Sequence, residues 1–259
     1  MKIGICSMDT AKYPLYKEIG FDYVEANLSI VATISDEEFE TYRKAVENVG
    51  IPVLRTNGFY PGGFKIVGAN ADRKKIEEYA KKALYRASKL GVKGCVFGSG
   101  RQRATEEGGS HDESYQDFIE VCRMMADEAK QYGIKIIIEP LNAEETDVVQ
   151  TVADGLKAVA DSKRDNVVTL ADFYHVFRTG ETLDAIENNG GALQHLHIAR
   201  ANMDRKYPHT DEDKAQCKVW ADALKKAGYD ETISLEGGLP EGEVEEVLRN
   251  VFELMQIFA

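Results

Sequence analysis

The hydrophobic pattern of the chain repeats one unit: an amphipathic helical stretch, a glycine and a short apolar run. Glycine ends a helix readily because it adopts the left-handed backbone conformation that other residues avoid. A short run of apolar or β-branched residues bounded in this way is typical of a buried parallel strand. The glycines at the clearest junctions are Gly20, Gly50, Gly91, Gly133 and Gly228.

The pattern predicts eight strands and at least seven helices. The predicted strands are Lys2–Ser7, Tyr23–Asn27, Val53–Asn57, Gly94–Phe97, Lys135–Glu139, Val167–Asp172, Leu193–His197 and Thr232–Glu236. Helical periodicity fills the intervals at about Asp36–Val49, Ala71–Leu90, His111–Tyr132, Val152–Asp161, Glu181–Asn188, Asp211–Ala227 and Glu243–Phe258. Ser35 and Glu38 have the spacing of a capping box at the start of the first of these helices.

Strands that alternate with helices throughout predict a parallel sheet covered by helices. Eight such units in about 250 residues fit an α/β fold of one domain, a (β/α)8 TIM barrel, over residues 1–259. A doubly wound open sheet is the competing arrangement, but no G-x-G-x-x-G motif follows the first strand. No linker or low-complexity stretch divides the chain.

Composition excludes several classes of partner. With 259 residues and 43% hydrophobic positions, the chain can build one large core. A net charge of −12 repels phosphate backbones and argues against nucleic acid. The sequence contains neither an apolar run of about 18 residues nor the pattern of a signal peptide at its start. Four scattered cysteines without a C-x-x-C pair fit a reduced protein. We therefore expect a cytoplasmic protein without a membrane partner.

Four potential metal ligands stand near the ends of four successive predicted strands: Glu139, Asp172, His197 and Glu236. Charged groups just past buried strands are costly to desolvate unless they are paired or bind an ion. In a barrel these strand ends converge, so the pattern predicts a metal site. Three carboxylates and one imidazole suit Mn²⁺, Mg²⁺ or Co²⁺, and Zn²⁺ is also compatible. Each residue also has a simpler alternative: an arginine partner for either glutamate, a helix cap for Asp172, and a hydrogen-bonded core position for His197.

Four segments carry a resemblance to a known family: Glu139–Asn142, Asp172–His175, His195–Ala199 and Ser234–Gly237. They are similar to the signature segments of the xylose isomerase-like TIM-barrel superfamily. Within it the chain resembles the sugar-phosphate isomerase/epimerase group, which includes ketose 3-epimerases, hydroxypyruvate isomerases and inosose isomerases. The resemblance implies a divalent metal, usually Mn²⁺, at the four predicted ligands.

The resemblance also implies a mechanism. A metal bound to a carbonyl and an adjacent hydroxyl oxygen stabilises a cis-enediolate, which lowers the pKa of the intervening C–H group. In ketose 3-epimerases the two glutamates at the positions of Glu139 and Glu236 transfer the proton, one on each face of the substrate. Both residues are therefore expected to be catalytic as well as metal ligands.

Further substrate contacts are implied by the same resemblance. Glu145 matches an acidic residue at the reacting end of the substrate, and His175 matches a histidine that binds a substrate oxygen. The simpler alternatives are a solvated loop carboxylate and a packing histidine. An arginine is expected where the chain has Met203, and Arg205 aligns with it if a two-residue insertion is allowed.

Two arginines lie in a loop after the fourth predicted strand that also looks like the family. Arg101 and Arg103 are placed either to bind a phosphate or carboxylate of the substrate or to pair with the nearby Glu106 and Glu107. We take Arg101 as the candidate substrate contact.

The predicted function is therefore isomerisation or epimerisation of a small carbohydrate-like molecule, with or without phosphate. A lyase or dehydratase acting on a keto-inositol, a dehydroshikimate-like acid or a 3-keto-glycoside would share the enolate and differ in losing water or an aglycone. An endonuclease IV-like phosphodiesterase would need more than the five histidines present, and a basic groove. A binding barrel without catalysis would not depend on the metal. The resemblance is also compatible with a homo-oligomer.

Overall fold

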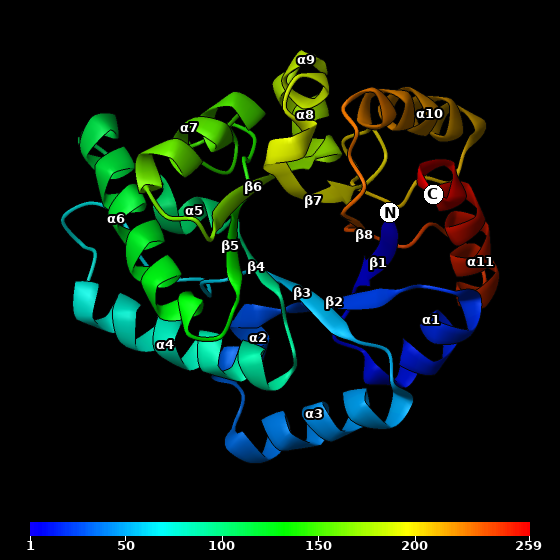
Figure 1. The fold of residues 1–259 in the computed structure, drawn as a ribbon, viewed down its shortest axis with the longest axis horizontal. Coiled ribbons are helices and arrows are strands. Elements are labelled where there is room, and N and C mark those ends of the chain that lie inside the picture. Colours follow the sequence, from blue (N-terminus) through cyan, green and yellow to red (C-terminus); the bar gives the residue numbers. More distant parts are fainter.

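The computed structural model describes residues 1–259 and contains eight parallel strands in a closed barrel. The strands pair in chain order, and β1 closes the barrel against β8 through Gly4 and Ser234. Helices form an outer ring around the strands (Figure 1). The strands are β1 Lys2–Cys6, β2 Tyr23–Asn27, β3 Val53–Asn57, β4 Gly94–Phe97, β5 Lys135–Ile138, β6 Val167–Asp172, β7 Leu193–Ile198 and β8 Thr232–Leu235. The predicted (β/α)8 barrel is confirmed.

The long helices lie where the periodicity predicts them, and none is both long and apolar enough to cross a membrane. The helices are α1 Tyr13–Ile19, α2 Leu28–Thr33, α3 Asp36–Val49, α4 Arg73–Lys89, α5 Gly100–Arg103, α6 His111–Lys130, α7 Val152–Ser162, α8 Phe173–Thr179, α9 Asp184–Glu187, α10 Asp211–Lys226 and α11 Val244–Met255. Short 3₁₀ turns occupy Thr10–Lys12, Gly190–Ala192 and Gln256–Phe258.

Local signals in the sequence define several helix ends. The predicted capping box is present: Glu38 N donates to Ser35 Oγ over 3.2 Å, and Ser35 N donates to Glu38 Oε2 over 2.8 Å. The five junction glycines all have positive φ, as a left-handed helix end requires.

The prediction was wrong in the region after β6. Instead of one helix at residues 181–188, the structure has α8 directly after the strand and only the single turn of α9. Aromatic and β-branched residues dominate the sequence of α8, and these form helices weakly in isolation. The helix begins because Asp172 Oδ1 accepts a hydrogen bond from Tyr174 N over 2.8 Å, which a periodicity argument does not detect.

The barrel interior determines which side chains reach its carboxyl end. Val96, Ile137 and Leu170 form a small apolar cluster inside the barrel. Side chains alternate along a strand, so the residue two positions later points to the same interior. Glu139 therefore follows Ile137, and Asp172 follows Leu170, into the layer above this cluster. The larger core fills the space between strands and helices.

Arg103 connects the segments that follow β4 and β5 at this end of the barrel through hydrogen bonds. The side chain is fully buried and donates to the carbonyl oxygens of Phe97 (3.2 Å), Glu139 (2.8 Å) and Val149 (3.1 Å). Both predictions for Arg103, a substrate anion or a neighbouring glutamate, were therefore wrong. A buried guanidinium needs partners for its donors, and here backbone carbonyls from β4 and the loop after β5 accept from Nη1 and Nη2, while Nε has no partner.

Replacing Arg103 should therefore destabilise the fold. We expect Arg103→Met to lower the free energy of unfolding by about 3 kcal/mol, because three buried carbonyls lose a charged donor. Arg101→Met is the matched control, since the neighbouring Arg101 is exposed. Urea unfolding of both variants measures the difference, and equal stabilities would contradict the role given to Arg103.

Candidate metal centre

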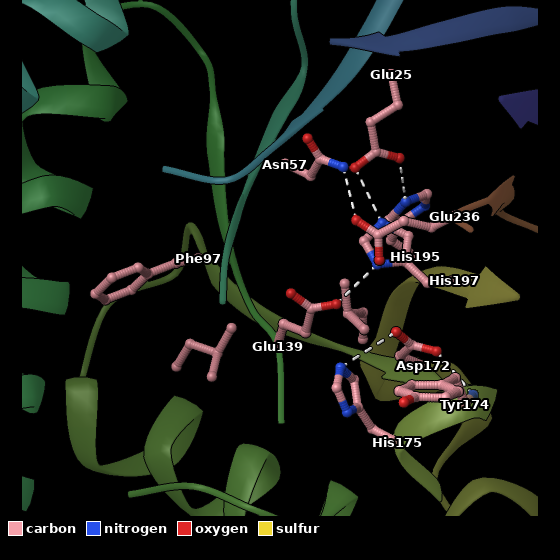
Figure 2. Close-up of polar contacts among 12 residues, drawn as sticks. Glu25, Asn57, Phe97, Glu139, Asp172, Tyr174, His175, His195, His197 and Glu236 are labelled. Atoms are coloured by element: carbon pink, nitrogen blue, oxygen red, sulfur yellow. Dashed lines mark hydrogen bonds and ion pairs between the residues drawn. The ribbon is translucent and has the colours of Figure 1, made fainter. Parts of the chain in front are cut away.

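Glu139, Asp172, His197 and Glu236 converge at the carboxyl end of the barrel. One ligand-type atom from each lies within 4.8 Å of the others, from the ends of β5, β6, β7 and β8 (Figure 2). His197 Nδ1 is 2.8 Å from Glu139 Oε1 and 3.1 Å from Glu236 Oε2. The structure thus brings together the four residues that the sequence singles out.

The charges of this cluster fit a cation. Burial and the negative charges of Glu236 and Asp172 raise the pKa of Glu139. Burial alone would also raise the pKa of Glu236, but the positive charges of His197 and Arg205 lower it. Buried carboxylates that repel one another are stabilised by a cation between them. An oxygen-rich set with one imidazole nitrogen suits a divalent first-row metal or Mg²⁺.

Arg205 reaches the cluster from the loop between β7 and α10. Its Nη2 lies 2.7 Å from Asp172 Oδ2 and 2.5 Å from Glu236 Oε2, and the guanidinium stands 4.7 Å from the centre of the Tyr174 ring. The residue has a positive φ of 46°, and its carbonyl accepts from Gly238 N over 2.9 Å. Arg205, which aligns with the expected arginine only when a two-residue insertion is allowed, therefore lies at the cluster.

Asp172 combines two of the positions considered for it. Its Oδ1 caps α8, and its Oδ2 faces Arg205 and lies 3.5 Å from His175 Nε2. The helix cap and the place in the cluster are therefore not alternatives. The cap fixes the rotation of the carboxylate, so the second oxygen points at the other three side chains.

His175 and Glu145 lie beside the cluster. His175 Nδ1 accepts from Asn142 N over 3.2 Å, which leaves its Nε2 for Asp172. Glu145 is partly exposed, accepts from Asn142 Nδ2 over 3.2 Å and lies 3.9 Å from His175 Nε2. Arg101 lies on α5 with an exposed side chain that makes none of these contacts.

Glu25 is a buried member of the site that the sequence reasoning missed. Its two oxygens lie 2.9 Å from His195 Nε2 and 3.0 Å from His197 Nε2 (Figure 2). Both histidines lower the pKa of Glu25 well below its usual value, although burial opposes them. Because Nε2–H of His197 is donated to Glu25, Nδ1 faces the cluster, and its lone pair would become available to a bound ion once the Nδ1 proton is lost. A glutamate inside the buried strand Tyr23–Asn27 was the available signal.

Asn57 and Cys6 also border the cluster. Asn57 Nδ2 donates to Glu236 Oε1 over 2.6 Å, which places this residue in direct contact with the cluster. Cys6 Sγ lies within 4.8 Å of ligand-type atoms of His197 and Glu236. Burial and the charges of Glu25 and Glu236 raise the pKa of Cys6, which favours the neutral thiol over a metal-binding thiolate.

Comparison with known proteins agrees with this geometry. The family model described as "Xylose isomerase-like TIM barrel" matches residues 14–254. The chain belongs to this family. Among curated relatives, D-psicose 3-epimerase of Agrobacterium fabrum is 28% identical over 206 residues, which cover 74% of this chain and 69% of the relative. The 3-dehydro-D-guloside 4-epimerase of Escherichia coli is 24% identical over 197 residues, 73% of this chain and 72% of the relative.

Solved structures of the family share the whole fold. A D-psicose 3-epimerase crystallised in the presence of D-fructose has a TM-score of 0.83 at 21% identity, covering 100% of this chain and 99% of the other. A 3-keto-D-glucoside 4-epimerase from E. coli has a TM-score of 0.81 at 21% identity and 99% coverage of both chains. The IOLI protein, described with a bound zinc atom, has a TM-score of 0.74 at 21% identity and covers 100% of this chain and 98% of its own. At these identities the likeness concerns the fold.

Changing Glu25 should alter the metal affinity of the centre. An amide in Glu25→Gln offers one acceptor where two histidine N–H groups need partners, so one imidazole must change its tautomer or its orientation. We expect the affinity for Mn²⁺ to fall about 10–100-fold, measured by competition with a fluorescent chelator.

The exposed Glu212 provides the control for that measurement. Glu212→Gln removes a similar negative charge at an exposed position on α10 that makes no contact with His195 or His197, and it should leave Mn²⁺ affinity unchanged. If Glu25→Gln behaved in the same way, Glu25 would have no part in orienting His197.

Proposed function

We propose that this chain is a divalent-metal-dependent sugar isomerase or epimerase that moves a proton beside the carbonyl group of an uncharged ketose. The observation that carries the proposal is the contact of both Glu139 and Glu236 with Nδ1 of His197 in a buried cluster that also includes Asp172. The names of the relatives, two sugar epimerases and a 2-oxo-tetronate isomerase from Haemophilus influenzae, support the same class of reaction. This isomerase is 32% identical over 126 residues, 48% of each chain.

Four residues would hold the ion: Glu139, Asp172, His197 and Glu236. The bound ion would supply Lewis acidity that polarises the carbonyl, acidifies the neighbouring C–H group and stabilises the resulting cis-enediolate. Mn²⁺ is the expected ion, and the donor set also suits Mg²⁺, Co²⁺ or Zn²⁺.

The protein side chains then perform the proton transfer. A carboxylate oxygen of Glu139 removes the carbon-bound proton as general base and is left protonated. Glu236, after taking up a proton from a substrate hydroxyl group or from water, would return that proton to the other face of the planar intermediate. Asn57 holds Oε1 of Glu236 at 2.6 Å, which fixes the direction of that carboxylate. Because both glutamates extend from the ends of barrel strands, their separation is set by the rigid scaffold.

Three neighbours would bind the substrate. His175 and Glu145 can receive hydroxyl groups of the sugar, since they lie beside the cluster and 3.9 Å from each other. Arg205 can donate to a substrate oxygen while it remains near Asp172, 2.7 Å away. Arg101 stays a predicted contact for the distal end of the substrate.

The charges around the centre favour an uncharged substrate over a phosphorylated one. Glu145 adds a fourth carboxylate to those of Glu139, Asp172 and Glu236, while Arg205 is already paired with two of them. A divalent ion does not outweigh these negative charges. A phosphate or carboxylate group close to the reacting carbons would therefore be repelled.

A lyase or dehydratase is the second candidate. Glu145 and His175 form a pair close to the cluster that could protonate a departing hydroxyl or aglycone. Elimination would begin with the same proton removal by Glu139. The two reactions differ in their products, since elimination changes the mass and isomerisation does not.

A panel of substrates in D₂O tests the function. Metal-loaded protein is incubated with uncharged ketoses, their phosphates, hydroxypyruvate and inososes, and NMR follows both exchange of the carbon-bound proton and product formation. We expect exchange and equal-mass products with uncharged ketoses. Release of water or an aglycone would establish the lyase, and preference for phosphates would refute the uncharged substrate.

The variant Glu139→Gln tests the proton transfer. We expect the exchange rate to fall at least about 10²-fold, because the amide cannot accept the proton, while the melting temperature changes little. Metal content is measured on the same sample, so that loss of the ion and loss of the base are distinguished. Glu107→Gln, an exposed position, is the control. Undiminished exchange in Glu139→Gln would remove Glu139 from the reaction.

A further inference from the structure

A polar cavity lies at the amino end of the barrel, opposite the candidate metal centre. It has a volume of about 460 Å³, within the range of small-molecule pockets, and opens between the first residues of β1, β3, β4 and β8. Three positively charged side chains line it: Lys2, Arg55 and Lys93. In a chain of net charge −12, such a gathering of cations is unexpected.

Arg55 is the residue that needs an explanation. Its side chain lines the cavity, yet the residue is only 8% exposed. Its Nε has no hydrogen-bond partner, and Nη1 makes a single long contact of 3.4 Å with the carbonyl oxygen of Leu54. A guanidinium stays charged in a protein, and burying a charge without a partner is unfavourable.

The other two buried arginines of the chain have more hydrogen-bond partners for their guanidinium groups. Arg86 donates to the carbonyls of Val31 and Ile34 over 2.8 and 2.7 Å and also pairs with Asp36. Arg103 donates to three backbone carbonyls through Nη1 and Nη2, although its Nε, like that of Arg55, has no partner. Arg55 has neither carbonyl groups in good geometry nor a carboxylate within ion-pair distance.

The carboxylate beside Arg55 in the sheet is already engaged. A register shift in β3 skips Leu54 and places Arg55 opposite Glu25 of β2. Both oxygens of Glu25, however, accept from His195 and His197. The strands around Arg55 therefore leave its guanidinium without a carboxylate partner, at the wall of the cavity.

We infer that this cavity binds a small tetrahedral oxyanion of the phosphate or sulfate class. Arg55 offers a planar array of donors, and Lys2 and Lys93 approach from the ends of two other strands without forming an ion pair of their own. A tetrahedral anion can direct an oxygen at each of three cations, whereas a planar carboxylate faces two directions at most.

The acidic residues of the cavity do not cancel this charge. Asp230 lies 2.7 Å from the amino group of Met1, which leaves Glu231 as the other carboxylate in the lining. The cavity lining thus contains three positively charged side chains and only one carboxylate, Glu231, that is not already paired. Bound there, the anion would tie β1, β3 and β4 together at the end of the barrel remote from catalysis, and this inference does not depend on the proposed function.

Thermal unfolding of the metal-loaded full chain tests the inference. Melting temperatures are recorded against phosphate, sulfate, acetate and chloride at constant ionic strength, with any affinity tag at the C-terminus so that the amino group of Met1 stays free. We expect a saturable rise with phosphate and sulfate and none with acetate or chloride, as ligand binding to the folded state requires. Saturation by acetate equal to that by phosphate would overturn the tetrahedral specificity.

Variants separate this site from general salt effects, since sulfate stabilises many proteins by exclusion from their surface. Arg55→Met should weaken the apparent phosphate affinity at least tenfold and Lys93→Ala severalfold. Lys44→Ala, an exposed lysine on α3, should leave it unchanged.

Calorimetric titration of phosphate into the same proteins gives the affinities directly. If Arg55→Met fails to fold, the phosphate affinity of Lys93→Ala relative to wild type tests the site. A phosphate response that is identical in wild type, Arg55→Met and Lys93→Ala would overturn the site. So would a response that rises linearly without saturation.

Discussion

The burial of three carboxylates at one end of a closed barrel is the constraint on which the rest of this structure depends. Glu139, Asp172 and Glu236 are brought together because eight parallel strands end on the same side, and like charges held this close are unstable unless they are compensated. Arg205 and His197 provide compensation in the protein itself. A divalent ion held by the same oxygens would compensate the three carboxylates more completely. The negative charge of this cluster therefore connects the fold to the proposed metal-dependent reaction.

A set of supporting contacts fixes the direction of each side chain in the cluster. Glu25 holds His197, Asn57 holds Glu236, and the start of α8 holds Asp172. Arg103 binds the carbonyl of Glu139 and joins the loops after β4 and β5. Groups that must transfer a proton need this kind of support, because a carboxylate free to rotate loses most of its geometric advantage. The barrel thus contributes rigidity, and the loops contribute Arg205 and Glu145, which would contact the substrate.

The two ends of the barrel interior have opposite electrostatic character. The carboxyl end gathers acidic residues, while the amino end gathers Lys2, Arg55 and Lys93 around a separate cavity. The barrel interior also contains the apolar cluster of Val96, Ile137 and Leu170 and the buried contact between Glu25 and His195. The proposed reaction would take place at the carboxyl end and the proposed anion would bind at the amino end, in line with the usual division of this architecture into a catalytic and a stabilising face. The proposed preference for an uncharged sugar would follow from the negative charges that surround the carboxyl end.

The sequence alone determined the strands, most helices and the four clustered residues, because hydrophobic periodicity, capping residues and strand-end charges are local signals. It did not determine which polar groups meet. Glu25 contacts histidines about 170 positions away in the chain. Arg103 and Arg55 look alike in sequence, although Arg103 donates to three buried carbonyls and Arg55 makes one long contact. The short helix α8 was missed because a single capping contact starts it. Partners distant in the chain are chosen by barrel closure and strand register, and these exist only in the tertiary structure.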